Sequence, residues 1–140
     1  MSLAMNQAER EQYLADLHVG VISMPDPAAG PLTAPIWYDY EPSKGLWVLI
    51  SPTSRKGKLA EVGKRISLVA QSEDMPYKYV SVEGPIRSIE PSKDGELLAM
   101  ATRYLGEEMG KAYAAQSTGE NVTVLMDVER WLTVDYAKLG

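Results

Sequence analysis

The chain has 140 residues, and its 45 % of apolar side chains is enough for one domain over residues 1–140 with a hydrophobic core. It contains no cysteine and a single histidine, His18, which excludes a disulfide framework, a thiolate nucleophile and a cluster of histidine metal ligands. A formal net charge of −5 and the lack of a long apolar run argue against nonspecific nucleic-acid binding and membrane insertion, and predict a cytoplasmic protein.

The first part of the chain alternates between strand and turn signals after an N-terminal helix. Apolar residues at mixed three- and four-residue spacings predict an amphipathic helix over 5–17. β-branched residues predict a strand over 18–24, and the proline- and glycine-rich segment 25–31 predicts the turn after it. Alternating aromatic residues over 32–41 predict a second strand, which a tight turn connects to a third over 46–51.

The second part adds a short helix, three strands and a helical excursion. A Gly84-Pro85 step suits a bulge or bend within the longest strand, and Ser92 is expected to cap the helical excursion. The expected elements are a helix over 55–63 with a glycine stop, strands over 64–73, 77–91 and 121–135, and one or two helices over 92–116. Six strands with short connections predict a mainly β (α+β) fold, an antiparallel β-barrel with helices packed outside.

Positive charge is concentrated in one place, at Arg55, Lys56 and Lys58, although the chain as a whole is acidic. If Thr53 or Ser54 caps the short helix, then Arg55 and Lys56 lie in its first turn. The helix dipole disfavours cations there unless an anion is present. A phosphate at this position would gain backbone N–H donors, a hydroxyl and two charged side chains, so the segment is a candidate phosphate site.

The same segment also has a purely structural interpretation. Gly57 would allow either a ligand or a neighbouring stretch of backbone to approach closely. Lys64 and Arg65 continue the positive charge, as on the solvated face of a basic helix. Spacing alone leaves the phosphate site and the solvated face both open.

Two segments, "SRKGKL" (54–59) and "YVSVEGPI" (79–86), together with "LWVLISPTS" before the first, resemble the pyridoxamine 5′-phosphate oxidase-like group of split β-barrel flavoproteins. The resemblance covers most of residues 10–135. It implies a six-stranded antiparallel split β-barrel with flanking helices, FMN or the deazaflavin F420 as cofactor, and a homodimer with cofactor sites at the subunit interface. True pyridoxamine phosphate oxidases carry an arginine-and-lysine motif on the early strand and an arginine-histidine element at the C-terminus. Here the early strand has no basic residue and the C-terminus has neither arginine nor histidine, so that substrate is not expected.

The resemblance also implies roles for individual residues. Ser54, Arg55 and Lys56 match the step that grips the cofactor phosphate in relatives, and Thr53 and Lys58 are neighbours expected to help. The residues expected to line the ring are Ile50, Ser51, Pro35, Ile36 and Trp37 from the same chain, with Tyr77, Tyr79 or Trp131 covering it from the partner subunit. For each of these aromatic residues the alternative is a place in the barrel core or the dimer interface.

The implied function is an FMN- or F420-dependent oxidoreductase that transfers hydride to or from a small unsaturated or quinone-like molecule. No catalytic side chain stands out, because Asp39, Glu41 and Glu83 are expected to be solvated strand or hairpin residues. The alternative is a non-catalytic protein that binds or carries a flavin, F420 or a tetrapyrrole. His18 is the only imidazole for a haem ligand, but its place at the start of a strand favours a partly buried structural role.

Overall fold

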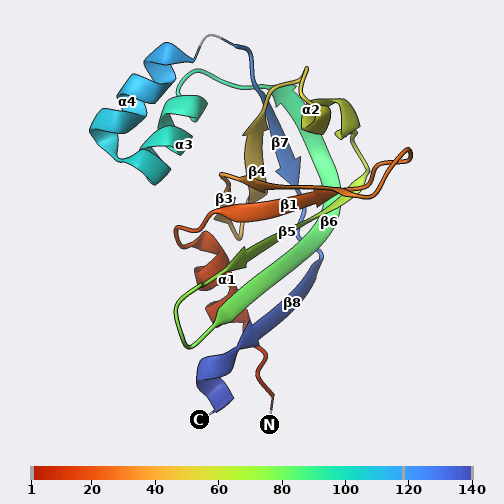
Figure 1. The fold of residues 1–140 in the computed structure, drawn as a ribbon, viewed down its shortest axis with the longest axis vertical. Coiled ribbons are helices and arrows are strands. Elements are labelled where there is room, and N and C mark those ends of the chain that lie inside the picture. The colour runs from red at the N-terminus through yellow and green to blue at the C-terminus, as the bar shows by residue number, and fades with distance from the viewer. Residues whose placement is uncertain (1, 118, 140) are drawn as a thin grey trace.

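The computed structural model describes residues 2–117 and 119–139, which form eight strands, four α-helices and one 3-10 helix (Figure 1). The strands are β1 (Gly20–Met24), β2 (Leu32–Ile36), β3 (Asp39–Glu41), β4 (Gly45–Ile50), β5 (Arg65–Gln71), β6 (Lys78–Pro91), β7 (Val122–Met126) and β8 (Arg130–Asp135). The helices are α1 (Gln7–Ala15), α2 (Arg55–Leu59), α3 (Glu96–Leu105), α4 (Glu107–Gln116) and the 3-10 helix η1 (Tyr136–Leu139).

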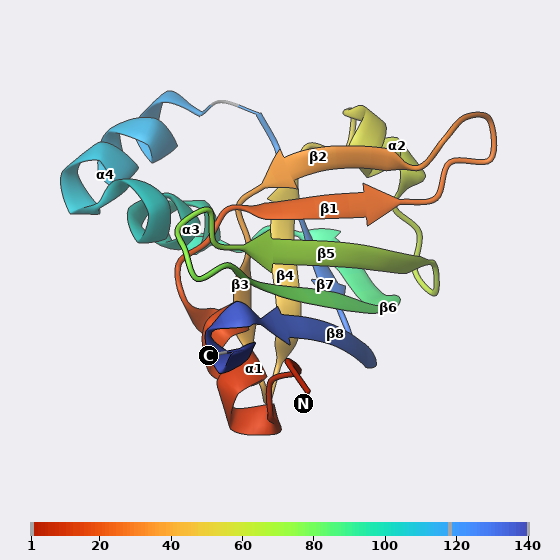
Figure 2. The same cartoon turned by 60° about the horizontal axis from the view of Figure 1, so that its bottom comes forward.

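The strands form one curled antiparallel sheet in the order β2-β1-β5-β6-β7-β4-β3, with β8 also pairing with β6. Figure 2 shows β2, β1, β5, β6 and β8 side by side in one layer, which crosses β4 and β7 behind it. The described strands do not close the barrel, because β2 and β3 are the two ends of the order. The sheet is therefore split between β2 on one side and β3 with β4 on the other.

The core lies inside the curl of the sheet. Inward-facing residues such as Ile22, Leu68 and Val82 are each 1 % exposed. Helix α1 closes one end of the barrel with the fully buried Leu14, whose carbonyl accepts a hydrogen bond of 2.7 Å from the Tyr38 hydroxyl. Burial of a leucine side chain of this kind stabilises the fold by about 1.5–3 kcal/mol.

The expected class, an antiparallel split barrel with flanking helices, is confirmed, but the expected number of six strands is wrong. Two of the expected strands are each interrupted. The strand expected over 32–41 breaks at Trp37 and Tyr38, because the backbone of Tyr38 bonds to the Tyr104 hydroxyl on α3 instead of to a neighbouring strand. The strand expected over 121–135 breaks at 127–129, where the chain leaves one part of β6 and joins another.

The Gly84-Pro85 step, where a bulge or bend was expected, lies where β6 changes partner, and the register irregularity of β6 follows it between Ile86 and Ser88. Strand β6 pairs with β8 before this step and with β7 after it. The backbone of 127–129 passes so close that a Cβ atom at Gly84 would lie 1.6 Å from the carbonyl oxygen of Asp127. Only glycine allows this approach, so the step fixes where β6 changes partner.

The helices also differ in detail from the sequence predictions. The expected cap at Ser92 is wrong: α3 begins after Gly95, and the Glu96 carboxylate accepts the backbone N–H of Lys93 in the turn before it. The helix expected over 55–63 ends at Leu59. None of the helices within the described ranges has the length and apolar character needed to cross a bilayer.

Candidate functional site

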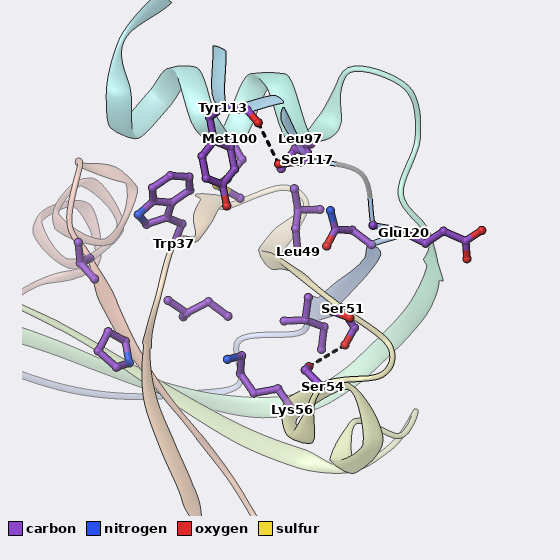
Figure 3. A pocket seen from close by; sticks show the side chains of 16 residues that line it. Trp37, Leu49, Ser51, Ser54, Lys56, Leu97, Met100, Tyr113, Ser117 and Glu120 are labelled. Atoms are coloured by element: carbon purple, nitrogen blue, oxygen red, sulfur yellow. Dashed lines mark hydrogen bonds between the residues drawn. The ribbon is translucent and has the colours of Figure 1, made fainter. Parts of the chain in front are cut away.

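A cavity of about 610 Å³ lies at the split in the barrel. Strand β2 and the end of β4 form two of its walls, α2 lies at one end, and the α3–α4 hairpin covers it from above (Figure 3). The cavity therefore occupies the gap between sheet edges that do not pair with each other.

The structure brings most of the expected site residues together in this cavity. Those that line it are Pro35, Ile36, Trp37, Ile50, Ser51, Ser54 and Lys56. They come from three segments of the chain that are separated by turns and a strand, so their convergence is a result of the fold. Their role toward a ligand stays a prediction.

Other lining residues were missed by the sequence reasoning. They are Val19, Leu49, Leu97, Met100, Tyr113, Ser117, Gly119, Glu120 and Asn121. Most lie on the α3–α4 hairpin and the segment after it, whose position over the split is set by tertiary contacts. Leu97 and Met100 have the three-residue spacing of an ordinary core-facing helix, and only the aromatic Tyr113 on a polar helix was a usable signal.

The polar end of the cavity is built by the turn between β4 and α2. Ser54 caps α2 as expected: its Oγ accepts the backbone N–H of Gly57 at 3.1 Å, and its hydroxyl donates to the Ser51 carbonyl at 2.7 Å. A Cβ atom at Gly57 would lie 2.2 Å from the same carbonyl oxygen. The close approach at Gly57 is therefore that of neighbouring backbone. This packing fixes the direction in which Lys56 extends into the cavity (Figure 3).

Three of the expected phosphate residues lie outside the cavity. The guanidinium of Arg55 forms an ion pair with Asp26 in the turn between β1 and β2. Thr53 and Lys58 are exposed. Lys56 and Glu120 are the only charged side chains among the described lining residues, and Figure 3 shows the Glu120 carboxylate directed away from the middle of the cavity.

An aromatic cluster forms the wall opposite Lys56. The Trp37 indole stacks on Tyr104 with ring centroids 5.1 Å apart, and Tyr113 lies tilted against it at 5.4 Å. Burial raises the pKa of the Tyr104 hydroxyl, which remains a neutral hydrogen-bonding group. The indole is thus held between two residues of the α3–α4 hairpin.

The other expected aromatic residues lie elsewhere in the chain. Tyr79 is on the outer face of the sheet, and Tyr77 is 49 % exposed just before β6. Trp131 packs against the hydrophobic core of the same chain, with its ring edge-on to Tyr40 and the Arg10 guanidinium over its face. This chain's own cavity therefore does not contain them.

The histidine and the carboxylates considered in the sequence also lie away from the cavity. His18 is half-buried and stacks on Tyr13 with ring centroids 4.3 Å apart, and burial lowers its pKa. Asp39 pairs with Arg103, and Glu83 lies within 4 Å of two arginines on the sheet surface. Within 2–117 and 119–139, no three His, Cys, Asp or Glu side chains are grouped to hold a metal ion.

Comparison with known proteins supports the fold. No family model matches the sequence, and no curated protein does. A solved structure of a conserved hypothetical protein from Mycobacterium tuberculosis is 22 % identical with a TM-score of 0.77, over 99 % of this chain and 89 % of that one. An F420 reductase is 19 % identical with a TM-score of 0.69, over 87 % and 94 % of the two chains. The heme storage protein HutZ from Vibrio cholerae is 17 % identical with a TM-score of 0.60, over 96 % of each chain. At these identities the similarities show the split-barrel fold alone.

Proposed function

We propose that the chain binds FMN or F420 in the cavity at the split and acts as an oxidoreductase on a small unsaturated or quinone-like molecule. The observation that carries this proposal is the construction of the cavity: an apolar and aromatic body with a single inward cation, Lys56, at one end. Its volume of about 610 Å³ is typical of small-molecule sites. A fold shared with an F420 reductase adds support.

The lining residues fit a flat ring system that carries one phosphate. The Lys56 ammonium and the Ser51 hydroxyl would hold the phosphate, whereas the Ser54 hydroxyl already makes two hydrogen bonds and positions the turn. Ile50 and Trp37 would pack against the ring and exclude water from it. When bound, a flavin or deazaflavin supplies the hydride-transfer chemistry, and the protein supplies binding and orientation.

The free sheet edges offer further polar contacts to a ring. Strand β3 pairs only with Gly45–Trp47 of β4, which leaves the rest of β4 without a strand partner on that edge in the described structure. In an antiparallel strand, alternate residues direct their N–H and C=O groups to opposite edges. Some of these groups on β4 therefore face the split, where they can bond to donors and acceptors in the plane of a ring.

A neighbouring cavity gives room for a substrate. This second cavity, of about 520 Å³, shares the lining residues Leu97, Gly119, Glu120 and Asn121 with the first. A ligand ring in the first cavity would therefore have open space beside it. This favours an enzyme over a carrier, which needs only one compartment.

We also propose that the protein is a homodimer, because one face of the sheet is uncovered. No helix of the described chain lies over the outer face of the front layer in Figure 2. The strand registers align a row of mostly apolar residues across this face: Pro35, Val21, Val69, Ser81 and Leu132. Leu132 is 61 % exposed, and an uncovered apolar face of this kind is typical of a protein interface.

The same face adjoins the cavity, which links dimerisation to cofactor binding. Val19 and Pro35 line the cavity, and Pro35 also belongs to the apolar row. A second copy docked on the row would cover this side of the cavity. Tyr79 lies on the same face and would then approach the partner's site, as expected from the sequence.

The alternative function is a non-catalytic carrier of a flavin, F420 or a tetrapyrrole. It is favoured by one observation: the described cavity wall contains no histidine and no inward carboxylate to act as an acid or base. A haem carrier fits less well, because His18 does not line the cavity and could not ligate the iron there.

Titration followed by turnover tests these alternatives. FMN and F420 are titrated into the purified protein and followed by absorbance and fluorescence, and the bound cofactor is then reduced and mixed with a panel of quinones. Submicromolar binding with oxidation of the reduced cofactor supports the oxidoreductase. Binding without turnover supports the carrier, and no binding of either cofactor refutes both flavin proposals.

A further inference from the structure

Consecutive basic residues on α2 point in different directions. Lys56 lines the cavity, whereas Arg55 does not and instead pairs with Asp26. Neighbouring residues of a helix are about 100° apart around its axis, so the two side chains leave α2 in different directions. The turn that carries Asp26, between β1 and β2, lies beside α2, and the Lys64 ammonium, which is 2.6 Å from the Leu59 carbonyl, is also directed toward this turn at Pro25.

In the ion pair between Asp26 and Arg55, the carboxylate is the more buried and more firmly held partner. The Asp26 side chain is 4 % exposed, whereas that of Arg55 is 59 % exposed. The Asp26 carboxylate also accepts the backbone N–H of Ala28 at 2.9 Å. This N–H and the Arg55 guanidinium lower the pKa of Asp26, so the carboxylate is charged at neutral pH and needs its cation.

A ligand phosphate would have to compete with Asp26 for Arg55. If Arg55 turned to a ligand, the Asp26 carboxylate, whose side chain is 4 % exposed, would keep only the backbone N–H of Ala28 as its partner. Arg55 therefore stays with Asp26 when the cavity is filled. The cavity then presents one inward cation, Lys56, to an anionic ligand.

We propose that Asp26 is a specificity-determining residue, which withdraws Arg55 from the cavity and so selects ligands that place a single phosphate at Lys56 over ligands with a diphosphate. This inference rests on the proposed function and assigns a ligand class within it. FMN and F420 each carry one phosphate group, whereas FAD carries a diphosphate, whose second phosphate would find no second cation among the described lining residues. The segment 54–59 therefore has both of the roles considered from its sequence. Lys56 contacts the anion, and Arg55 has a structural role in its ion pair with Asp26.

The test compares dissociation constants for FMN, F420 and FAD in four variants, with Lys111→Gln on α4 as a control for loss of one positive charge. Wild type is expected to bind FMN or F420 more tightly than FAD. Lys56→Gln is expected to weaken binding at least about tenfold, and Arg55→Gln less than about threefold. Asp26→Asn, which keeps the shape of the side chain, is expected to release Arg55 and tighten FAD binding at least about threefold. The double variant Asp26→Asn/Arg55→Gln is expected to lose that gain.

Several results would overturn the inference while leaving the proposed function intact: tighter binding of FAD than of FMN and F420 by wild type, an Arg55→Gln defect as large as that of Lys56→Gln, or no gain in Asp26→Asn. The unfolding midpoints of the same variants provide a measure that needs no ligand. The shift in midpoint of the double variant is expected to be smaller than the sum of the shifts of Asp26→Asn and Arg55→Gln, because the two side chains form one ion pair. Shifts that simply add would also overturn the inference. If wild type binds none of the three ligands, the proposed function fails and the inference fails with it.

Discussion

The indole of Trp37 lies 5° from parallel to the ring of Tyr104, with ring centroids 5.1 Å apart. The Tyr104 hydroxyl accepts the backbone N–H of Tyr38 at 3.1 Å and lies within hydrogen-bonding distance of the carbonyls of Tyr38 and His18. One residue of α3 thus holds both the ring of Trp37 and the backbone that follows it. This contact places the aromatic wall of the cavity and interrupts the sheet between β2 and β3.

Replacement of Tyr104 by phenylalanine tests the hydroxyl separately from the ring. Tyr104→Phe keeps the stack on Trp37 but leaves the N–H of the buried Tyr38 without a partner, so we expect a loss of about 1–3 kcal/mol in unfolding free energy. Tyr104→Leu also removes the stack and should cost about 0.5–1.5 kcal/mol more. Urea unfolding measures both. Tyr136→Phe, at a tyrosine that is 45 % exposed, is the control, and equal stability of the two Phe variants would contradict the assignment.

Replacement of Gly57 by alanine tests the turn that directs Lys56. The new Cβ would lie 2.2 Å from the Ser51 carbonyl oxygen, so α2 must move away from the end of β4. We expect a loss of about 1–3 kcal/mol in unfolding free energy together with weaker FMN or F420 binding. Gly30→Ala is the matched control, because a Cβ there meets nothing within 4 Å. Similar stability and affinity in both variants would show that the turn is not tightly packed.

A charged residue in the apolar row of the outer sheet face tests dimerisation. Leu132→Arg places a cation at a residue that is 61 % exposed in the single chain, and we expect it to convert a dimer to a monomer. Met109→Arg changes a residue on α4 with 62 % exposure and should leave the dimer intact. Analytical ultracentrifugation measures the mass of each. A wild-type monomer, or a dimer that persists in Leu132→Arg, would contradict this interface.

The pKa of His18 predicts how stability depends on pH. Burial lowers this pKa in the folded state below the ordinary value of 6.5, which holds in the unfolded chain. The unfolded state therefore takes up a proton first as the pH falls. The contribution of neutral His18 to the unfolding free energy is complete above pH 6.5. It is lost as the pH falls from that value to the lowered pKa of the folded state. Wild type should accordingly lose more unfolding free energy between neutral and mildly acidic pH than His18→Gln does, as measured by urea unfolding at each pH. If the unfolding free energies of the two proteins fall in parallel with pH, His18 does not cause the loss.

Much of the fold follows from local sequence signals, and its interruptions do not. Alternation of apolar residues locates the strands, and glycine with proline at 84–85 marks the point where β6 changes partner. The segment 32–41 has strand-like residues throughout, so nothing local marks the break at Tyr38. That break depends on a hydroxyl 66 residues away in sequence, on Tyr104. Tertiary hydrogen bonds of this kind override strand propensity.

The candidate site divides in the same way. The cap at Ser54 could be predicted from local sequence, and the resemblance led us to expect Ser51 and Lys56 at one site. The direction of Arg55 could not, because it depends on Asp26 in another turn. The place of Tyr113 in the cavity wall could not be predicted either, because it depends on how the α3–α4 hairpin folds back over the split. Contacts between distant segments determine both.

Recognition of the ligand phosphate by Lys56 can be measured by removing the phosphate from the ligand and the charge from the side chain. Dissociation constants are measured for FMN against riboflavin, and for F420 against its phosphate-free chromophore, in wild type and in Lys56→Gln. Wild type is expected to bind the phosphorylated member of at least one pair at least about tenfold more tightly, and Lys56→Gln is expected to remove the difference. Equal affinity for both members of each pair in wild type, or a phosphate preference that survives in Lys56→Gln, would contradict recognition of the phosphate by Lys56.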